Sequence, residues 1–181
     1  MRKFLLSVLI GLASAGSLCA QSDDTKLLEI GWHPVSYLRQ FGATHWGGSI
    51  SGAYMKSNRL AYVADVSFQQ TRGTSQVVTA AYRFGPRIYH PVQDRFKVFA
   101  EVLAGGAHHG TKVVAVGTTN TVTPGRNGFA VAAGGGVDYS IRPWFSWRVA
   151  QVDYSLVHVA GGSSNGVRVQ TGGVFRFATR K

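Results

Sequence analysis

The feature that most constrains this fold is an alternation of apolar and polar residues that recurs along the chain after residue 25. Helical periodicity is hard to find, whereas alternation with a period of two indicates half-buried β-strands. Eight segments show it, each near the roughly 9 to 11 residues that a tilted strand needs to cross a bilayer. The segments are Lys26–Tyr37, Gly48–Lys56, Leu60–Gln70, Gln76–Tyr89, Phe96–Ala107, Asn127–Ile141, Trp144–Val157 and Gly166–Ala178. The pattern predicts an all-β protein.

Each segment has one apolar face and one polar face. In Leu60–Gln70, Tyr62, Val66 and Phe68 share the first face, and Asp65 and Ser67 share the second. A soluble sandwich points the apolar face toward its core, whereas a membrane barrel points it toward lipid and fills its interior with the polar face. The alternation by itself is compatible with both architectures.

The charges in the middle of the segments favour the membrane barrel. Five acidic and six basic residues fall on the polar faces, and a buried charge network requires such a near balance because an unpaired buried charge is costly. We expect these residues to form a luminal polar network that plugs a narrow barrel. They are Glu29, Asp65, Arg83, Arg87, Lys97, Glu101, Asp138, Arg148, Asp153, Arg168 and Arg176.

Other residues of the segments point the same way. The polar faces are rich in Gly, Ala and Ser, which suit a narrow lumen, and aromatic residues gather near the segment ends, as in the interfacial girdles of membrane barrels. These aromatics include Trp32, Trp46, Phe68, Tyr89 and Trp144. Ordinary β-propensity of aromatic residues is the alternative explanation.

The first 20 residues are typical of a secretory signal peptide. Arg2 and Lys3 precede an apolar stretch, Phe4–Ala13, and small residues lead to a cleavage boundary at Ala20. A lipoprotein anchored at Cys19 and an uncleaved helix are the alternatives. We expect export to the periplasm, followed by one barrel domain over residues 21–181. That domain has no cysteine and no run of 18 apolar residues for a transmembrane helix.

The connectors alternate in length. Ser57–Arg59, His90–Arg95 and Arg142–Pro143 are short, whereas 38–47, 71–75, 108–126 and 158–165 are mostly longer. Outer-membrane barrels have short periplasmic turns and longer extracellular loops. The sequence therefore predicts an eight-stranded antiparallel up-and-down transmembrane β-barrel with both termini in the periplasm.

One segment departs from strict alternation. Arg148 and Asp153 are five residues apart, so a regular strand would place them on opposite faces. A β-bulge near Ala150 and Gln151 would bring both side chains inside. Without it, one charge would face lipid, at a cost of about 2–4 kcal/mol for an arginine at the midplane.

The segments near the C-terminus resemble a known family. Gly134-Gly135-Gly136-Val137-Asp138-Tyr139, the Trp147-Arg148-Val149 and Val152-Asp153-Tyr154 stretches, and the closing Gly172-Gly173-Val174-Phe175-Arg176-Phe177 are similar to the small eight-stranded outer-membrane barrels of the OmpA/OmpX-like group. The resemblance implies recognition of the last strand by the barrel-assembly machinery. Four residues follow Phe177, so the aromatic is not C-terminal as in the family pattern.

Motifs for catalysis or metal binding are weak. His108 and His109 are adjacent and would point to opposite faces of a strand, so we expect a polar loop tip and no metal site. A lipid-modifying enzyme would need His158 to pair with Ser163 or Ser164, with Asp153 as the orienting carboxylate. The Gly-rich loop around those serines is equally typical of a flexible turn. We expect no catalytic site and no cofactor.

The mature chain carries a net charge of +9 without a continuous basic stripe, so nucleic acid is not an expected partner. Four cations outside the lumen, Arg39, Arg72, Lys112 and Arg126, would lie on the long-loop face and contact lipopolysaccharide phosphates. We expect a monomeric, non-enzymatic outer-membrane barrel that contacts outer-membrane lipid and serves envelope structure or surface interaction. A narrow porin-like channel is the alternative.

Overall fold

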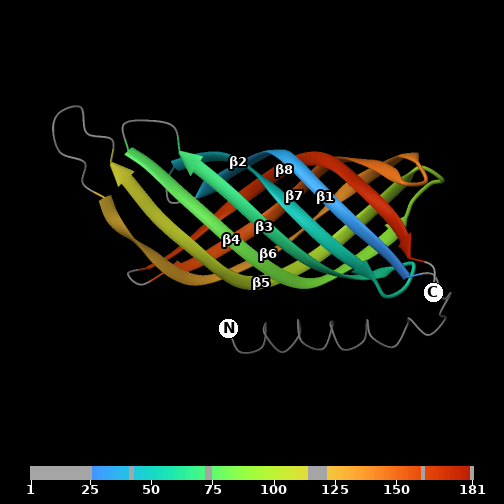
Figure 1. The fold of residues 1–181 in the computed structure, drawn as a ribbon, viewed down its shortest axis with the longest axis horizontal. Helices are drawn as coiled ribbons and strands as arrows, with labels where there is room; N and C mark the ends of the chain where they lie inside the picture. Colours follow the sequence, from blue (N-terminus) through green and yellow to red (C-terminus); the bar gives the residue numbers. More distant parts are fainter. Residues whose placement is uncertain (1–25, 41–42, 72–74, 114–121, 160–161, 180–181) are drawn as a thin grey trace.

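The computed structural model describes residues 26–40, 43–71, 75–113, 122–159 and 162–179, and these residues form a closed antiparallel β-barrel (Figure 1). Each strand pairs with its neighbours in sequence, and β1 pairs with β8 to close the sheet. This is the eight-stranded up-and-down barrel that the alternation predicts. The strands are β1 (Lys26–Gln40), β2 (Ala43–Met55), β3 (Leu60–Thr71), β4 (Ser75–Pro91), β5 (Phe96–Val113), β6 (Val122–Arg142), β7 (Phe145–Val159) and β8 (Gly162–Thr179).

The barrel has two unlike ends. Three tight turns, after β2, β4 and β6, lie at the end where β1 begins and β8 ends, on the right in Figure 1. In two of them Lys56 N–H donates to Leu60 O at 2.8 Å and Val92 N–H donates to Phe96 O at 3.0 Å. We call this the short-turn end and the opposite end the loop end.

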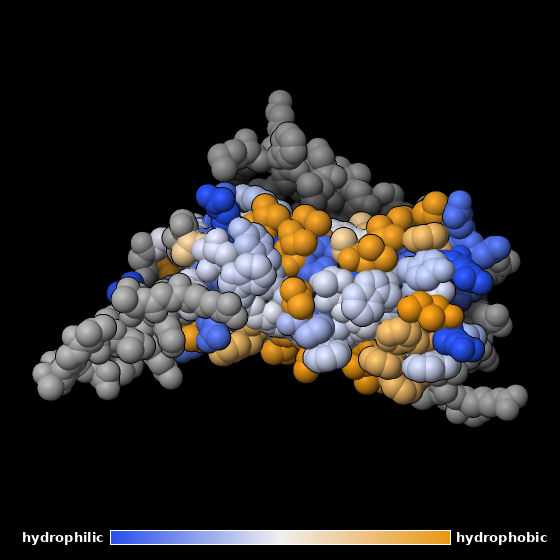
Figure 2. Space-filling view, turned by 90° about the horizontal axis from the view of Figure 1, so that it is seen from above, coloured by the Kyte–Doolittle hydropathy of each residue, from blue (hydrophilic) through white to orange (hydrophobic). Residues whose placement is uncertain are grey.

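The wall of the barrel is apolar outside and polar inside. Val66 and Tyr82 expose 60 % and 66 % of their surface, whereas Asp65 and Arg83, next to them in sequence, expose 2 % and 4 %. Figure 2 shows apolar residues in orange along the wall, with hydrophilic residues in blue toward the ends, including the short-turn end on the right. An exterior of this kind is stable in lipid, since a soluble sheet buries its apolar face.

The strands extend further at the loop end than the alternation predicts. β5 continues to Val113 and β6 begins at Val122, so much of the expected 108–126 loop is strand. His108 and His109 therefore lie on β5, and their expected position at a loop tip is wrong. At about 3.3 Å per residue, the 21 residues of β6 exceed the span of a tilted strand across the hydrocarbon core, so its loop-end part lies beyond the lipid.

Small and aromatic side chains complete the interior. Ala53, Val63, Tyr89, Phe99 and Leu103 belong to one buried cluster toward the short-turn end. A second cluster of Ala81, Ala107, Ala130, Val157 and Val159 lies toward the loop end. Tyr89, expected in the aromatic girdle, is buried instead because it lies two residues from Arg87 on the inward face of β4. Among the described residues, no helix is long and apolar enough to cross a membrane.

Candidate functional site: the polar lumen and the loop-end rim

Strand alternation directs the predicted luminal residues into one interior. Of the eleven, ten are buried, and Lys97 is half-buried at the short-turn end of β5. The ten comprise five carboxylates and five guanidinium groups, so their formal charges cancel. This balance matters because removing one member of a buried pair leaves a charge without compensation.

The tightest cluster lies in the middle of the lumen around Arg168 of β8. Its Nη1 donates to Asp65 Oδ1 of β3 at 2.8 Å, and its Nη2 and Nε donate to Asp153 Oδ2 of β7 at 2.7 and 2.9 Å. The side chains of Arg168 and Asp153 are 0 % exposed, and that of Asp65 is 3 % exposed. One guanidinium thus bridges two carboxylates across the barrel, from β8 to β3.

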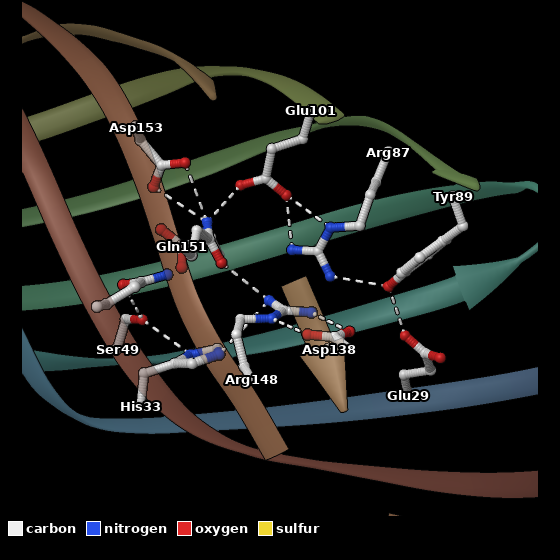
Figure 3. Close-up of polar contacts among 12 residues, drawn as sticks. Glu29, His33, Ser49, Arg87, Tyr89, Glu101, Asp138, Arg148, Gln151 and Asp153 are labelled. Carbon is white, nitrogen blue, oxygen red and sulfur yellow. Dashed lines mark hydrogen bonds and ion pairs between the residues drawn. The ribbon is translucent and has the colours of Figure 1, made fainter. Parts of the chain in front are cut away.

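A chain of hydrogen bonds runs from this cluster toward the short-turn end (Figure 3). The Gln151 amide donates to both Asp153 and Glu101, at 3.0 and 2.7 Å. Arg87 Nε donates to Glu101 at 2.6 Å, and its Nη1 donates to the Tyr89 hydroxyl at 3.1 Å. Side chains from β4, β5 and β7 are therefore cross-linked through the lumen.

This series of hydrogen bonds ends at Glu29 of β1. The Tyr89 hydroxyl donates to Glu29 Oε2 at 2.6 Å, and Arg176 Nε of β8 donates to Glu29 Oε1 at 2.7 Å. Arg176 Nη1 also donates to Ser146 Oγ at 2.6 Å. These contacts tie the first and last strands together at the short-turn end.

A parallel branch centres on Arg148 of β7. Its Nε and Nη2 donate to the two Asp138 oxygens at 2.8 and 3.1 Å, and its Nη1 donates to Gln151 at 2.9 Å. The guanidinium carbon lies 4.3 Å from the centre of the Phe99 ring. His33 Nδ1 lies 3.2 Å from Ser49 Oγ, and this hydroxyl donates to Gln170 at 3.0 Å.

A bulge in β7 makes this branch possible. The pairing of β7 with β8 shifts between Arg148 and Gln151, and Val137 pairs with Ala150 whereas Asp138 pairs with Arg148. The extra residue restores the phase, so Arg148 and Asp153 both face the lumen. The bulge predicted from their five-residue spacing is confirmed.

Arg83 is the least satisfied member of the network. Its Nη2 donates to Ser67 Oγ at 3.0 Å, while Nε and Nη1 are buried without a hydrogen-bond partner in the described part of the chain. Arg83 is paired in register with Asp65, whose carboxylate binds Arg168. Arg83 is thus a second cation beside a carboxylate that Arg168 already holds.

These contacts leave the middle of the lumen filled by side chains. Bidentate pairs, bridging amides and aromatic rings occupy successive levels from Asp65 to Glu29. Glycine provides the room, because a Cβ on Gly134 would meet the Asp153 side chain and one on Gly136 would meet the Phe99 ring. The arrangement is that of a rigid plug.

The predicted lipopolysaccharide contacts are placed in part. Arg39 is exposed near the loop end of β1, and Arg126 is exposed on β6. Lys112 lies on β5, with a side chain outside the described part, and Arg72 lies outside the described residues. The segment expected to be a signal peptide, residues 1–20, also lies outside them.

Several uncharged polar side chains share this loop-end exterior. His158 Nδ1 lies 2.7 Å from Ser163 Oγ, His108 Nδ1 lies 2.7 Å from Asn127 Oδ1, and Asn165 Nδ2 donates to the Tyr154 hydroxyl at 2.6 Å. We call these residues, with Arg39 and Arg126, the loop-end rim. Its position above the apolar wall suits the headgroup region of a membrane.

The Ser–His pair of the rim lacks the expected carboxylate. Asp153 is 0 % exposed inside the lumen and held by Arg168, whereas His158 is exposed on the outer face. His108 is exposed and His109 is half-buried beside Thr79, as opposite faces of one strand require. No cluster of three metal-binding side chains occurs among the described residues.

Four members of the hydrogen-bond network were not predicted from the sequence. Tyr89, Gln151, His33 and Ser49 carry no fixed charge, whereas the predicted network consists of charged side chains only. A strict count of inward positions finds Tyr89, since it follows Arg87 by two residues. Gln151 needs the bulge to be placed first.

Comparisons with known proteins agree on architecture. No protein-family model matches the chain, and no curated protein matches it in sequence. Ail, the attachment invasion locus protein of Yersinia pestis, matches with a TM-score of 0.58 and 15 % identity, over 86 % of this chain and 100 % of that chain. Neisserial surface protein A matches with a TM-score of 0.60 and 14 % identity, over 87 % and 98 %.

A third match is the N-terminal β-barrel domain of Pseudomonas aeruginosa OprF, with a TM-score of 0.50 and 16 % identity over 83 % of this chain and 97 % of that domain. Ail has also been solved with the heparin analogue sucrose octasulfate. At such low identities the likeness concerns the fold. The chain has the fold of the small eight-stranded outer-membrane β-barrels.

Proposed function

We propose that this protein is a monomeric, non-enzymatic outer-membrane barrel that acts through its loop end, in envelope structure or surface interaction. The single observation that carries the proposal is the combination of an apolar exterior with a lumen filled by paired charges. The exterior suits lipid, and the filled lumen leaves the rim and the loops as the surfaces that meet other molecules. Export by the signal peptide and insertion by the barrel-assembly machinery belong to the same proposal.

The filled lumen argues against the channel alternative. A water path would have to displace Arg168 from two carboxylates and Arg148 from another. Breaking even one such buried pair costs about 3–5 kcal/mol. The enzyme alternative lacks an orienting carboxylate beside His158 among the described residues, and without one the Ser163 hydroxyl stays a weak nucleophile.

We propose anionic lipopolysaccharide phosphates as the ligand of the rim. Arg39 and Arg126 are exposed where the apolar wall gives way to polar side chains, and guanidinium groups form charge-assisted hydrogen bonds with phosphate. Ail, a protein of the same fold, has been crystallised with a polysulfated sugar. That observation concerns Ail, and it supports testing the present rim with an anionic saccharide.

Two experiments test the proposal. Outer-membrane fractions are run boiled and unboiled on a gel, and a heat-dependent shift in this fraction is the expected result; a soluble protein without the shift would refute the location. Then Arg39→Gln/Arg126→Gln is compared with Lys56→Gln/Arg59→Gln at the other end for binding to lipopolysaccharide. Weaker binding only in the first variant is expected, and equal binding in both variants rejects the rim as the ligand site.

A further inference from the structure

An open hollow lies at the short-turn end, between the β4–β5 turn and β6. Its volume is about 450 Å³, and its lining residues are Gln93, Asp94, Arg95, Phe96 and Tyr139. The turn is held in place, because Phe96 N–H donates to Gln93 O at 3.1 Å and Ser140 N–H donates to Arg95 O at 2.7 Å. The hollow is therefore a formed feature of the barrel end.

A cation and an anion both line the hollow. Arg95 Nη1 donates to the Tyr139 hydroxyl at 3.3 Å, which holds the exposed guanidinium over the hollow and raises the pKa of Arg95. Asp94, the preceding residue, is also exposed and lines the same space. A molecule seated there meets a positive and a negative group together.

Two aromatic rings also line the hollow. The Phe96 and Tyr139 rings lie 5.0 Å apart, and Phe96 exposes 37 % of its surface. Trp144 and Trp147 are exposed on the neighbouring β6–β7 hairpin. Aromatic residues of membrane barrels lie at the level of the lipid headgroups. The charged groups of the hollow thus lie at the level of the phosphates.

We propose that this hollow binds the phosphoethanolamine headgroup of a phospholipid in the leaflet that faces the short turns. Arg95 pairs with the phosphate, Asp94 accepts hydrogen bonds from the ammonium group, and the glycerol and acyl part leaves over Phe96 and Tyr139. The proposal requires insertion in a membrane, but it does not depend on what the loop end binds.

The chemistry of the two charged groups separates this ligand from other phospholipids. Phosphatidylcholine carries the same phosphate, but its quaternary ammonium has no N–H to donate to Asp94. Phosphatidylglycerol has no cation and brings net negative charge beside a carboxylate. Lys56, Arg59 and Arg142 are also exposed at the short-turn end. If these cations attracted lipids without selectivity, the anionic phosphatidylglycerol would be favoured.

The test uses the full mature chain, folded and inserted in phosphatidylcholine nanodiscs that contain equal small fractions of phosphatidylethanolamine and phosphatidylglycerol. Native mass spectrometry measures the lipids that stay bound after release from the disc. Relative to its share of the disc, we expect phosphatidylethanolamine to be retained about two- to five-fold more than phosphatidylcholine. That ratio corresponds to the free energy of an exposed ion pair. Asp94→Asn abolishes that preference, and Arg95→Gln weakens retention of both lipids.

Two further variants control the result. Tyr139→Phe keeps the ring against Phe96 and removes the hydroxyl that holds Arg95, so it weakens retention of both lipids less than Arg95→Gln does. Arg142→Gln removes an exposed cation outside the hollow and leaves the preference unchanged. A preference for phosphatidylglycerol in the wild type, or retention that Asp94→Asn and Arg95→Gln leave unaltered in folded protein, overturns the proposal.

Discussion

Replacing Arg168 with leucine tests the luminal network at its most connected point. Arg168 is 0 % exposed and makes three hydrogen bonds to Asp65 and Asp153. Leucine fills part of the volume but leaves two buried carboxylates without their cation. The substitution therefore destabilises the folded barrel by leaving uncompensated charge, in addition to removing contacts.

The magnitude follows from that geometry. Breaking a buried ion pair costs about 3–5 kcal/mol, and the bridging position of Arg168 places the loss at the upper end of that range. Arg83 lowers this cost, because it pairs in register with Asp65 and has two donor nitrogens without partners in the described chain. The double variant Arg168→Leu/Arg83→Leu is therefore expected to lose more unfolding free energy than the two single variants lose together.

Unfolding by urea in lipid vesicles, followed by the fluorescence of the four tryptophans, measures these free energies. The matched rescue is Arg168→Leu/Asp65→Asn/Asp153→Asn, which removes the stranded charges and recovers most of the stability. Arg39→Gln, on the exterior, serves as the control and changes stability by less than about 1 kcal/mol. If Arg168→Leu unfolds at the same urea concentration as the wild type, the reasoning about buried charge is wrong.

Three other perturbations follow from the same structure. Deleting Ala150 removes the bulge and leaves regular alternation, so the variant still folds and shifts on an unboiled gel, whereas deleting Val152 turns Asp153 outward and abolishes the shift. Gly134→Leu fails to fold in vesicles, because its Cβ would meet the Val152 carbonyl and the Asp153 side chain. Ala133→Leu on the outer face folds normally, and folding of both variants would contradict close packing around Gly134. In planar bilayers the wild-type barrel carries no steady ion current, and a stable open conductance would contradict a filled lumen.

Alternation was enough to predict the eight strands and the faces of their charged residues. Each strand must place polar groups on one side and apolar groups on the other, so Asp65 and Arg83 could be assigned without coordinates. The same logic predicted the bulge, because only an extra residue reconciles Arg148 with Asp153. Alternation does not say which face meets lipid. That prediction rests on the near balance of charges, the small residues of the polar faces, the aromatic residues near the segment ends and the expected signal peptide.

The loop-end parts of the strands could not be predicted in this way. Beyond the lipid a strand needs no apolar face, so Thr111 and Lys112 of β5 carry no alternation and resemble a loop in sequence. The expected position of one aromatic residue was wrong as well. Tyr89 suits a girdle by its type, but its inward position and its hydrogen bonds to Arg87 and Glu29 place it in the network.

Which luminal residues pair with one another could not be predicted from the sequence either. Which carboxylate binds Arg168 depends on the stagger of the strands around the barrel, which brings β3, β7 and β8 to one level. Alternation fixes the face of each residue and leaves its depth open. The Arg95 hollow escaped for the same reason, because Tyr139 is 44 residues from Arg95 and meets it only through the pairing of β5 with β6.

The central claim is that the barrel wall is apolar outside and polar inside, and a cysteine scan of β3 tests it most directly. The scan needs no other change to the sequence, because the only cysteine, Cys19, lies within the expected signal peptide. Each variant carries one cysteine and is folded into vesicles. The first set replaces the outward residues Tyr62, Ala64, Val66 and Phe68, and the second set replaces the inward residues Val63, Asp65 and Ser67. A lipid-soluble maleimide is expected to label the first set and leave the second unlabelled. Labelling of the second set, or reaction of the first set with a membrane-impermeant reagent, would contradict a lipid-facing apolar wall.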